Sequence, residues 1–167
     1  MARIALLSTS DTDLLSARAS GSGFAWANPA RTPIGPAVEG ADIVIARILG
    51  SPDDVDDEIR ALGERVPLIV LGGELTPNAA MMQLSRRVPA GVVNEVHRYL
   101  VNGGPGNLTN LHAFLSDTLL LTGDEFAPPQ ELPTWGVLDR SAAQADSVAP
   151  RVGVLFYRAP VSYTHLR

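Results

Sequence analysis

The chain of 167 residues contains no cysteine and no lysine, and aromatic residues make up only 5% of it. The absence of cysteine excludes disulfides, thiolate metal sites and cysteine nucleophiles. Because aromatic residues are so few, we expect a core built mainly from Leu, Val, Ile and Ala. All thirteen positive side chains are arginines and the net charge is −5, which argues against a nucleic-acid-binding surface.

Long hydrophobic runs are also missing. No stretch approaches the roughly 18 consecutive apolar residues that suggest a membrane helix, and the N-terminus turns polar too early for the apolar region of a signal peptide. The overall balance, with 46% hydrophobic and 19% charged residues, is typical of a globular protein. We therefore expect a cytoplasmic globular protein with one well-buried domain and some length to spare.

Short apolar runs bounded by turn residues predict buried parallel strands. They lie at residues 3–8, 23–29, 41–50 and 67–74. Helical patterns lie between and after them, at residues 11–19, 51–67, 77–89, 91–104 and 107–123. The alternation of strands and helices predicts an α/β fold, a flavodoxin-like open, mainly parallel sheet with flanking helices.

This pattern dissolves after the last of these helices. Residues 123–150 contain four prolines and no sustained periodicity, so we interpret them as a linker that follows an N-terminal α/β domain at residues 1–122. The apolar run at 151–159 predicts the first strand of a second α/β unit, and the chain has no room to complete such a unit.

The last seven residues, Val161–Arg167, have a distinctive sequence, VSYTHLR. It resembles the translation of a transposon end used as a sequencing adapter, and Pro160 then corresponds to a codon that is part native and part adapter. We therefore interpret residues 160–167 as a non-native tail and the second unit as truncated. A natural strand and tail is the alternative.

Several stretches, in order from Ile4 to Ala159, together resemble the N-terminal region of the cobaltochelatase large subunit, in the CobN/magnesium chelatase H family. They include LLSTSDTDLLSARAS, WANPAR, ARILG, LIVLGGE, VPAGVVNEVHRYLVNGGPGNL, FLSDTLLLTG, FAPP, PTWGV and VGVLFYRA. The chain departs from the family where RILGS stands in place of a double glycine, and the segment after it is short.

The resemblance implies a function for the complete subunit. It would bind a corrinoid, hydrogenobyrinic acid a,c-diamide, and insert Co(II) into it during aerobic cobalamin biosynthesis. An AAA+ ATPase subunit and a third subunit would couple ATP hydrolysis to insertion, and the isolated fragment would be inactive. A magnesium chelatase large subunit acting on protoporphyrin is the alternative within the family. A stand-alone α/β module for ligand binding or interaction is the alternative outside it.

Metal insertion needs a base and metal ligands. His97 and His112 each stand alone within a helical segment, without the spacing of a paired metal site, so we expect surface or partly buried histidines. The acids of Asp53–Glu58 are expected in the first turn of a helix, and Ser8–Ser10 are expected to cap a helix more readily than to bind an anion. We assign no catalytic residue, no bound cofactor and no metal ligand.

The candidates for substrate binding lie at the ends of predicted strands, where doubly wound sheets bind ligands. They are Arg47, Gly72, Gly73, Glu74, Tyr157 and Arg158. Arg47 could pair with a carboxylate of the macrocycle, and a structural ion pair is its alternative role. The glycines allow close approach of a ligand to the backbone, and a plain turn is their alternative.

Overall fold

Four short segments pair into one parallel sheet in the computed structural model, which describes residues 2–131. Its strands are β1 (Ile4–Ser8), β2 (Ala25–Ala27), β3 (Ile43–Arg47) and β4 (Leu68–Leu71). Their order across the sheet is β2-β1-β3-β4, and every pairing is parallel. The predicted α/β class is confirmed, and each of the four strands falls within its predicted range.

The strands are mainly apolar, with Ser8 and Arg47 as polar last residues of β1 and β3, because helices cover both faces of the sheet. All residues of β1, β3 and β4 are buried. In β1, Ile4 and Leu6 point into one core, while Ala5 and Leu7 point into the other. Continuous burial on both faces removes the alternation of polar and apolar residues that a half-exposed strand would show.

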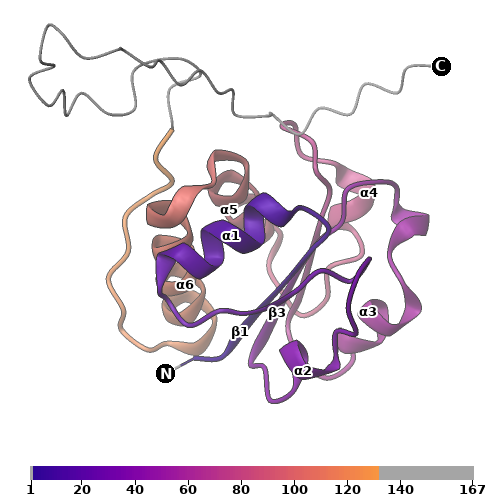
Figure 1. Ribbon diagram of the computed structural model, residues 1–167. Coiled ribbons are helices and arrows are strands. Elements are labelled where there is room, and N and C mark those ends of the chain that lie inside the picture. Colours follow the sequence, from indigo (N-terminus) through magenta and orange to yellow (C-terminus); the bar gives the residue numbers. More distant parts are fainter. Residues whose placement is uncertain (1, 132–167) are drawn as a thin grey trace, which may run out of the picture.

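The helices form a layer on each side of the sheet (Figure 1). Residues of α1 (Asp11–Ser20), α5 (Ala90–Asn102) and α6 (Gly104–Leu120) share the first core with the sheet. Residues of α2 (Gly35–Val38), α3 (Asp57–Leu62) and α4 (Ala79–Met82) share the second. No helix among the described residues is long and apolar enough to cross a membrane.

The prediction of one continuous helix over residues 51–67 is wrong. Residues Pro52–Asp54 form a 3₁₀ turn, η1, with Ser51 and Asp54 in a reciprocal capping arrangement, and α3 follows after a break. The break lies at Val55, whose backbone is extended. The Arg60 guanidinium stabilises it by donating to the Val55 carbonyl at 2.9 Å and to the Pro52 carbonyl.

Two other helices also differ from expectation. The helix predicted over 77–89 is confined to α4, because the chain then pairs with the edge of the sheet. Arg86 and Leu68 exchange main-chain hydrogen bonds at 2.8 and 3.0 Å, and the Ser85 hydroxyl accepts from the Val70 amide. The short helix α2 lies outside all the predicted helical ranges.

After α6 the chain has no helix or strand in the described part, yet it stays attached to the domain. Residues 121–131 run along the outside of the α5 and α6 helices (Figure 1). Pro129 is buried in this segment, and its neighbours bond to side chains of both helices. The rest of the predicted linker, the strand predicted at 151–159 and the tail lie outside the described residues.

Candidate functional site

Arg47 ends β3 at the carboxyl edge of the sheet, and its side chain turns inward beneath the loops. The residue is only 4% exposed. Its Nη1 donates to Asp13 Oδ1 at 2.8 Å and to the Leu100 carbonyl at 3.2 Å. Its Nε and Nη2 donate to the carbonyls of Gly72 and Gly73, each at 3.3 Å. One guanidinium therefore joins β3 to α1, α5 and the turn after β4.

Asp13 completes this buried ion pair from the first turn of α1. Its second carboxylate oxygen accepts from the Ser8 hydroxyl at 2.7 Å, and that hydroxyl in turn accepts from the Ser10 amide at 3.0 Å. Burial raises the pKa of Asp13, while the neighbouring Arg47 charge and the Ser8 hydrogen bond act in the opposite direction. Ser10 precedes the helix as predicted, but its side chain makes no capping bond.

The turn after β4 presents carbonyls inward and one acid outward. Gly72 and Gly73 are buried, and their carbonyls are engaged by Arg47. Glu74 is exposed, and its carboxylate accepts from the Asn78 amide group at 3.0 Å. A Cβ added at Gly72 would lie 2.0 Å from the Glu74 carboxylate, so a side chain there would displace that flexible group.

His97 closes this cluster from α5. Its Nε2 lies 3.0 Å from the Glu74 carbonyl, and the residue is 4% exposed. Burial lowers the pKa of His97, and the Arg47 charge lowers it further. The expectation of a surface or partly buried histidine is wrong here, because the side chain holds the turn after β4 against the helix.

The structure thus brings four of the six predicted binding residues together at one edge, Arg47, Gly72, Gly73 and Glu74. Arg47 uses its guanidinium inside the fold, which favours the structural ion pair over contact with a ligand. Of the four, Glu74 is the residue whose side chain faces solvent. Tyr157 and Arg158 lie outside the described residues.

The crevice between β1 and β3 is where a doubly wound sheet usually binds its ligand. Hydrogen bonds close it here. The Thr9 amide donates to the Arg47 carbonyl at 3.2 Å, and the Thr9 hydroxyl accepts from the Leu49 amide at 2.9 Å. The Ser8 hydroxyl and the amides of Thr9 and Ser10, which are among the donors available to an anion here, are thus engaged within the protein.

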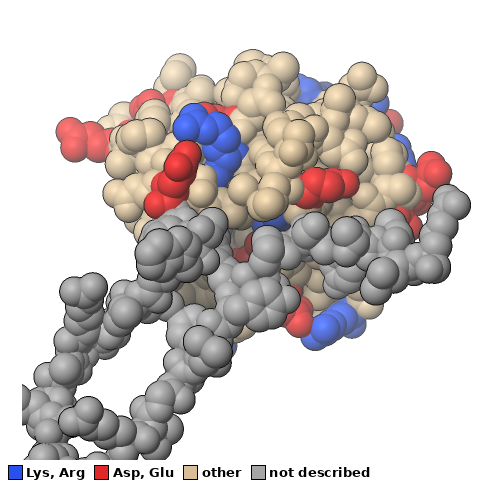
Figure 2. Space-filling view, turned by 90° about the horizontal axis from the view of Figure 1, so that it is seen from above, with Lys and Arg blue, Asp and Glu red and all other residues tan. Residues whose placement is uncertain are grey.

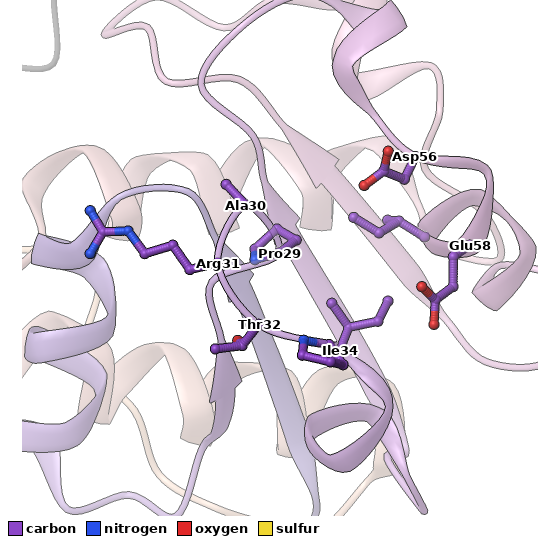
Figure 3. Close-up of a pocket in the computed structure, with 9 residues that line it drawn as sticks. Pro29, Ala30, Arg31, Thr32, Ile34, Asp56 and Glu58 are labelled. Carbon is purple, nitrogen blue, oxygen red and sulfur yellow. The ribbon is translucent and has the colours of Figure 1, made fainter.

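A pocket of about 260 Å³ lies between the loop after β2 and the start of α3 (Figure 3). Its lining residues are Pro29, Ala30, Arg31, Thr32, Pro33, Ile34, Asp56, Glu58 and Ile59. Arg31 points away from the two acids in Figure 3 and pairs with Asp11 at 2.8 Å. The pocket is smaller than the roughly 300–1,000 Å³ of typical small-molecule sites, so it is too small for a macrocycle.

His112 lies on the far side of the sheet from this pocket, in α6. It is 6% exposed, its ring meets Phe24 edge-on at a centroid distance of 5.0 Å, and its Nε2 has no hydrogen-bond partner among the described residues. Burial lowers its pKa. Its packing places it in the core, so the expectation of a surface or partly buried residue is wrong here as well.

Within residues 2–131, no group of three or more histidines and acids is placed to hold a metal ion. Figure 2, which looks down on the domain, shows acidic and basic side chains dispersed over an uncharged surface rather than gathered into one basic patch. Among the acids of Asp53–Glu58, Asp54 bonds back to Ser51, and those bonds lower its pKa.

Two comparisons with known proteins find relatives. Residues 97–167 match the family described as CobN/Magnesium Chelatase. That range begins within α5 and includes Val161–Arg167, whose interpretation as a non-native tail stays a prediction. No curated protein sequence matches the chain.

A solved structure also matches, described as the catalytic subunit of cobaltochelatase from Mycobacterium tuberculosis. The sequence identity is 44% and the TM-score 0.78. The match covers 83% of this chain and 12% of that one, so the chain spans about an eighth of the relative's length.

Proposed function

Because this chain belongs to the CobN/magnesium chelatase family, we propose that it forms the N-terminal part of the large, tetrapyrrole-binding subunit of an ATP-dependent cobaltochelatase. The complete subunit inserts Co(II) into hydrogenobyrinic acid a,c-diamide in the cytoplasm. An AAA+ ATPase subunit and a third subunit supply the energy of ATP hydrolysis. The observation that carries this proposal is the similarity, in sequence and fold together, to the catalytic subunit from M. tuberculosis.

Within that subunit we assign a scaffolding role to the described domain. Metal insertion requires a base for the pyrrolic protons and ligands that deliver the metal. The buried ionisable side chains at the carboxyl edge are instead committed to internal hydrogen bonds, as Arg47 and Asp13 illustrate. The reacting groups are therefore expected in parts of the subunit that this chain does not contain, and the 167-residue chain alone is expected to be inactive.

The test begins with the coding DNA, read beyond the codon for Ala159 by a method that uses no transposon adapter. We expect an open frame that continues into a much longer subunit. That subunit, with its two partners, ATP and Co(II), should metallate the corrinoid, while the 167-residue chain in its place should not.

Three outcomes would contradict the proposal. Insertion of Mg(II) into protoporphyrin, in preference to cobalt into the corrinoid, would favour the magnesium chelatase. A genomic stop codon directly after Arg167 would favour the stand-alone module. Metallation by the short chain without partners would refute the scaffolding role.

A further inference from the structure

The segment after α6 is bound to the domain through its main chain. The Ala127 amide donates to Asn110 Oδ1 at 2.8 Å, and the Ala127 carbonyl accepts from the Tyr99 hydroxyl at 2.6 Å. The Gln130 amide donates to Asn107 Oδ1 at 2.8 Å, and the Gln130 carbonyl accepts from Asn107 Nδ2 at 2.9 Å. Ala127 and Gln130 thus each have both their amide and their carbonyl bonded to a side chain of α5 or α6.

Apolar contacts reinforce these bonds. Phe126 packs edge-on against Phe114 of α6 at a centroid distance of 5.2 Å, and Pro129 is buried. Tyr99 is fully buried, and burial raises the pKa of its hydroxyl to about 12. The hydroxyl therefore remains a donor to Ala127 throughout the physiological pH range.

The composition of the segment suits this binding. Pro128 and Pro129 stand between the two anchored residues, and neither has an amide proton that would need a partner. Consecutive prolines also hold the backbone extended before it binds, which reduces the entropy lost on docking. On α6, Asn107, Asn110 and Phe114 lie at spacings that place them on one face of a helix.

The segment runs antiparallel to α6. Phe126 contacts Phe114, Ala127 contacts Asn110 and Gln130 contacts Asn107, so the chain returns from the end of α6 toward its start. Figure 1 shows this path, from the end of the domain that holds the N-terminus to the opposite end. The start of α6 follows directly on the α5 terminus, where the Leu100 carbonyl binds Arg47.

We propose that residues 126–130 form a latch on α5 and α6, which fixes the polypeptide's exit from the domain at the carboxyl edge of the sheet. The chain then stays bound to the domain as far as Gln130, rather than leaving it at the end of α6. This proposal does not depend on the metal or the macrocycle. It identifies the α5–α6 face as an intrachain docking surface whose occupant is the chain's own Phe-Ala-Pro-Pro-Gln segment.

Amide hydrogen exchange, followed by NMR on the 167-residue chain, tests the latch. We expect the amides of Ala127 and Gln130 to be protected in the wild type. The N107A variant removes both hydrogen bonds to Gln130 and a third, within the helix, to the Gly103 carbonyl. Gln130 protection should therefore fall at least tenfold, while the Leu6 amide in β1 stays protected. The matched control is N94A, which loses a side-chain bond to Ala90 within α5 and should leave Gln130 unchanged.

Two further variants keep the test decisive. Replacing Pro128 and Pro129 together by glycine should lower the protection of both anchored amides, because the segment is no longer held extended. If N107A also exposes the Leu6 amide, Y99F decides, since it removes only the hydroxyl that holds Ala127. Unprotected Ala127 and Gln130 amides in the wild type, or protection that N107A and Y99F leave unchanged, would overturn the latch.

Discussion

Replacing Asp13 by alanine should lower the free energy of unfolding by about 3–5 kcal/mol, because it leaves the Arg47 guanidinium buried without its counter-charge. Asp13 and Arg47 are 7% and 4% exposed, and the ion pair is 2.8 Å long. With the delocalised charges centred about 4 Å apart and an effective dielectric constant of about 20, their attraction is about 4 kcal/mol. The carbonyls of Gly72, Gly73 and Leu100 still solvate the cation in the variant, so we expect the lower half of the range.

Urea unfolding of the 167-residue chain at neutral pH, followed by far-UV circular dichroism, measures this effect. The control is R31A, which removes an ion pair to Asp11 whose side chains are 68% and 50% exposed. Exposed pairs contribute about 0.2–1 kcal/mol, so this variant should unfold nearly as the wild type does. A D13A variant within 1 kcal/mol of the wild type would refute the argument that Arg47 depends on its buried partner.

A double-mutant cycle separates the pair from its surroundings. In the double variant with Asp13→Ala and Arg47→Met, no charge remains buried, so its destabilisation should be smaller than the sum of the two single changes by at least about 1.5 kcal/mol. Strict additivity would mean that the two side chains contribute independently, in contradiction to the hydrogen bond between them.

Three other predictions follow from single features. Burial lowers the pKa values of His97 and His112 below the ordinary 6.5, so the unfolded state binds more protons than the folded state as the pH falls. The free energy of unfolding should therefore decrease between pH 7.5 and pH 5.5, as thermal unfolding across that range would measure. The H112F variant should show a smaller decrease, because it removes one of the two histidines. Gly21 ends α1 with φ of 65° and has nothing within 4 Å of an added Cβ, so G21A should cost about 1–2 kcal/mol through backbone strain alone, as urea unfolding would show. Leu121 ends α6 with φ of 56° and is 85% exposed, so L121G should instead raise stability by about 0.5–1 kcal/mol in the same assay; a loss would contradict the strain argument.

The strands could be predicted because their signal is local. A strand covered on both faces is apolar at every position, and β1, β3 and β4 carry such runs, each ended by polar or glycine residues. The break in the helix predicted over 51–67 depends instead on one side chain, because Arg60 holds two carbonyls that precede α3. The spacing of apolar residues along the sequence carries no information about that contact. The early end of α4 depends likewise on pairing between Arg86 and Leu68, which are far apart in the sequence.

The candidate site shows the same division between local and distant information. The sequence predicts that Arg47 lies at the end of a strand, and it also predicts the turn at Gly72, Gly73 and Glu74. The partners that determine what Arg47 does are Asp13 and Leu100, which lie 34 and 53 residues away. Asp13 and Leu100 come close to Arg47 because α1 and α5 pack on the sheet. No sequence motif or residue spacing predicts these contacts.

The closed crevice and the latch lie at the same edge of the sheet, and together they favour a structural role for this edge. Arg47 and the Thr9–Leu49 contact occupy the position where a comparable sheet would receive a ligand. The Asn107–Gln130 contact brings the chain back to the start of α6, beside Leu100, whose carbonyl binds the same guanidinium. A rigid cluster beneath the edge would keep that attachment fixed, since movement of α5 would break the Arg47 bond. On this proposal the domain holds residues 126–130 in place, and Glu74 is the residue of the turn after β4 whose side chain faces solvent.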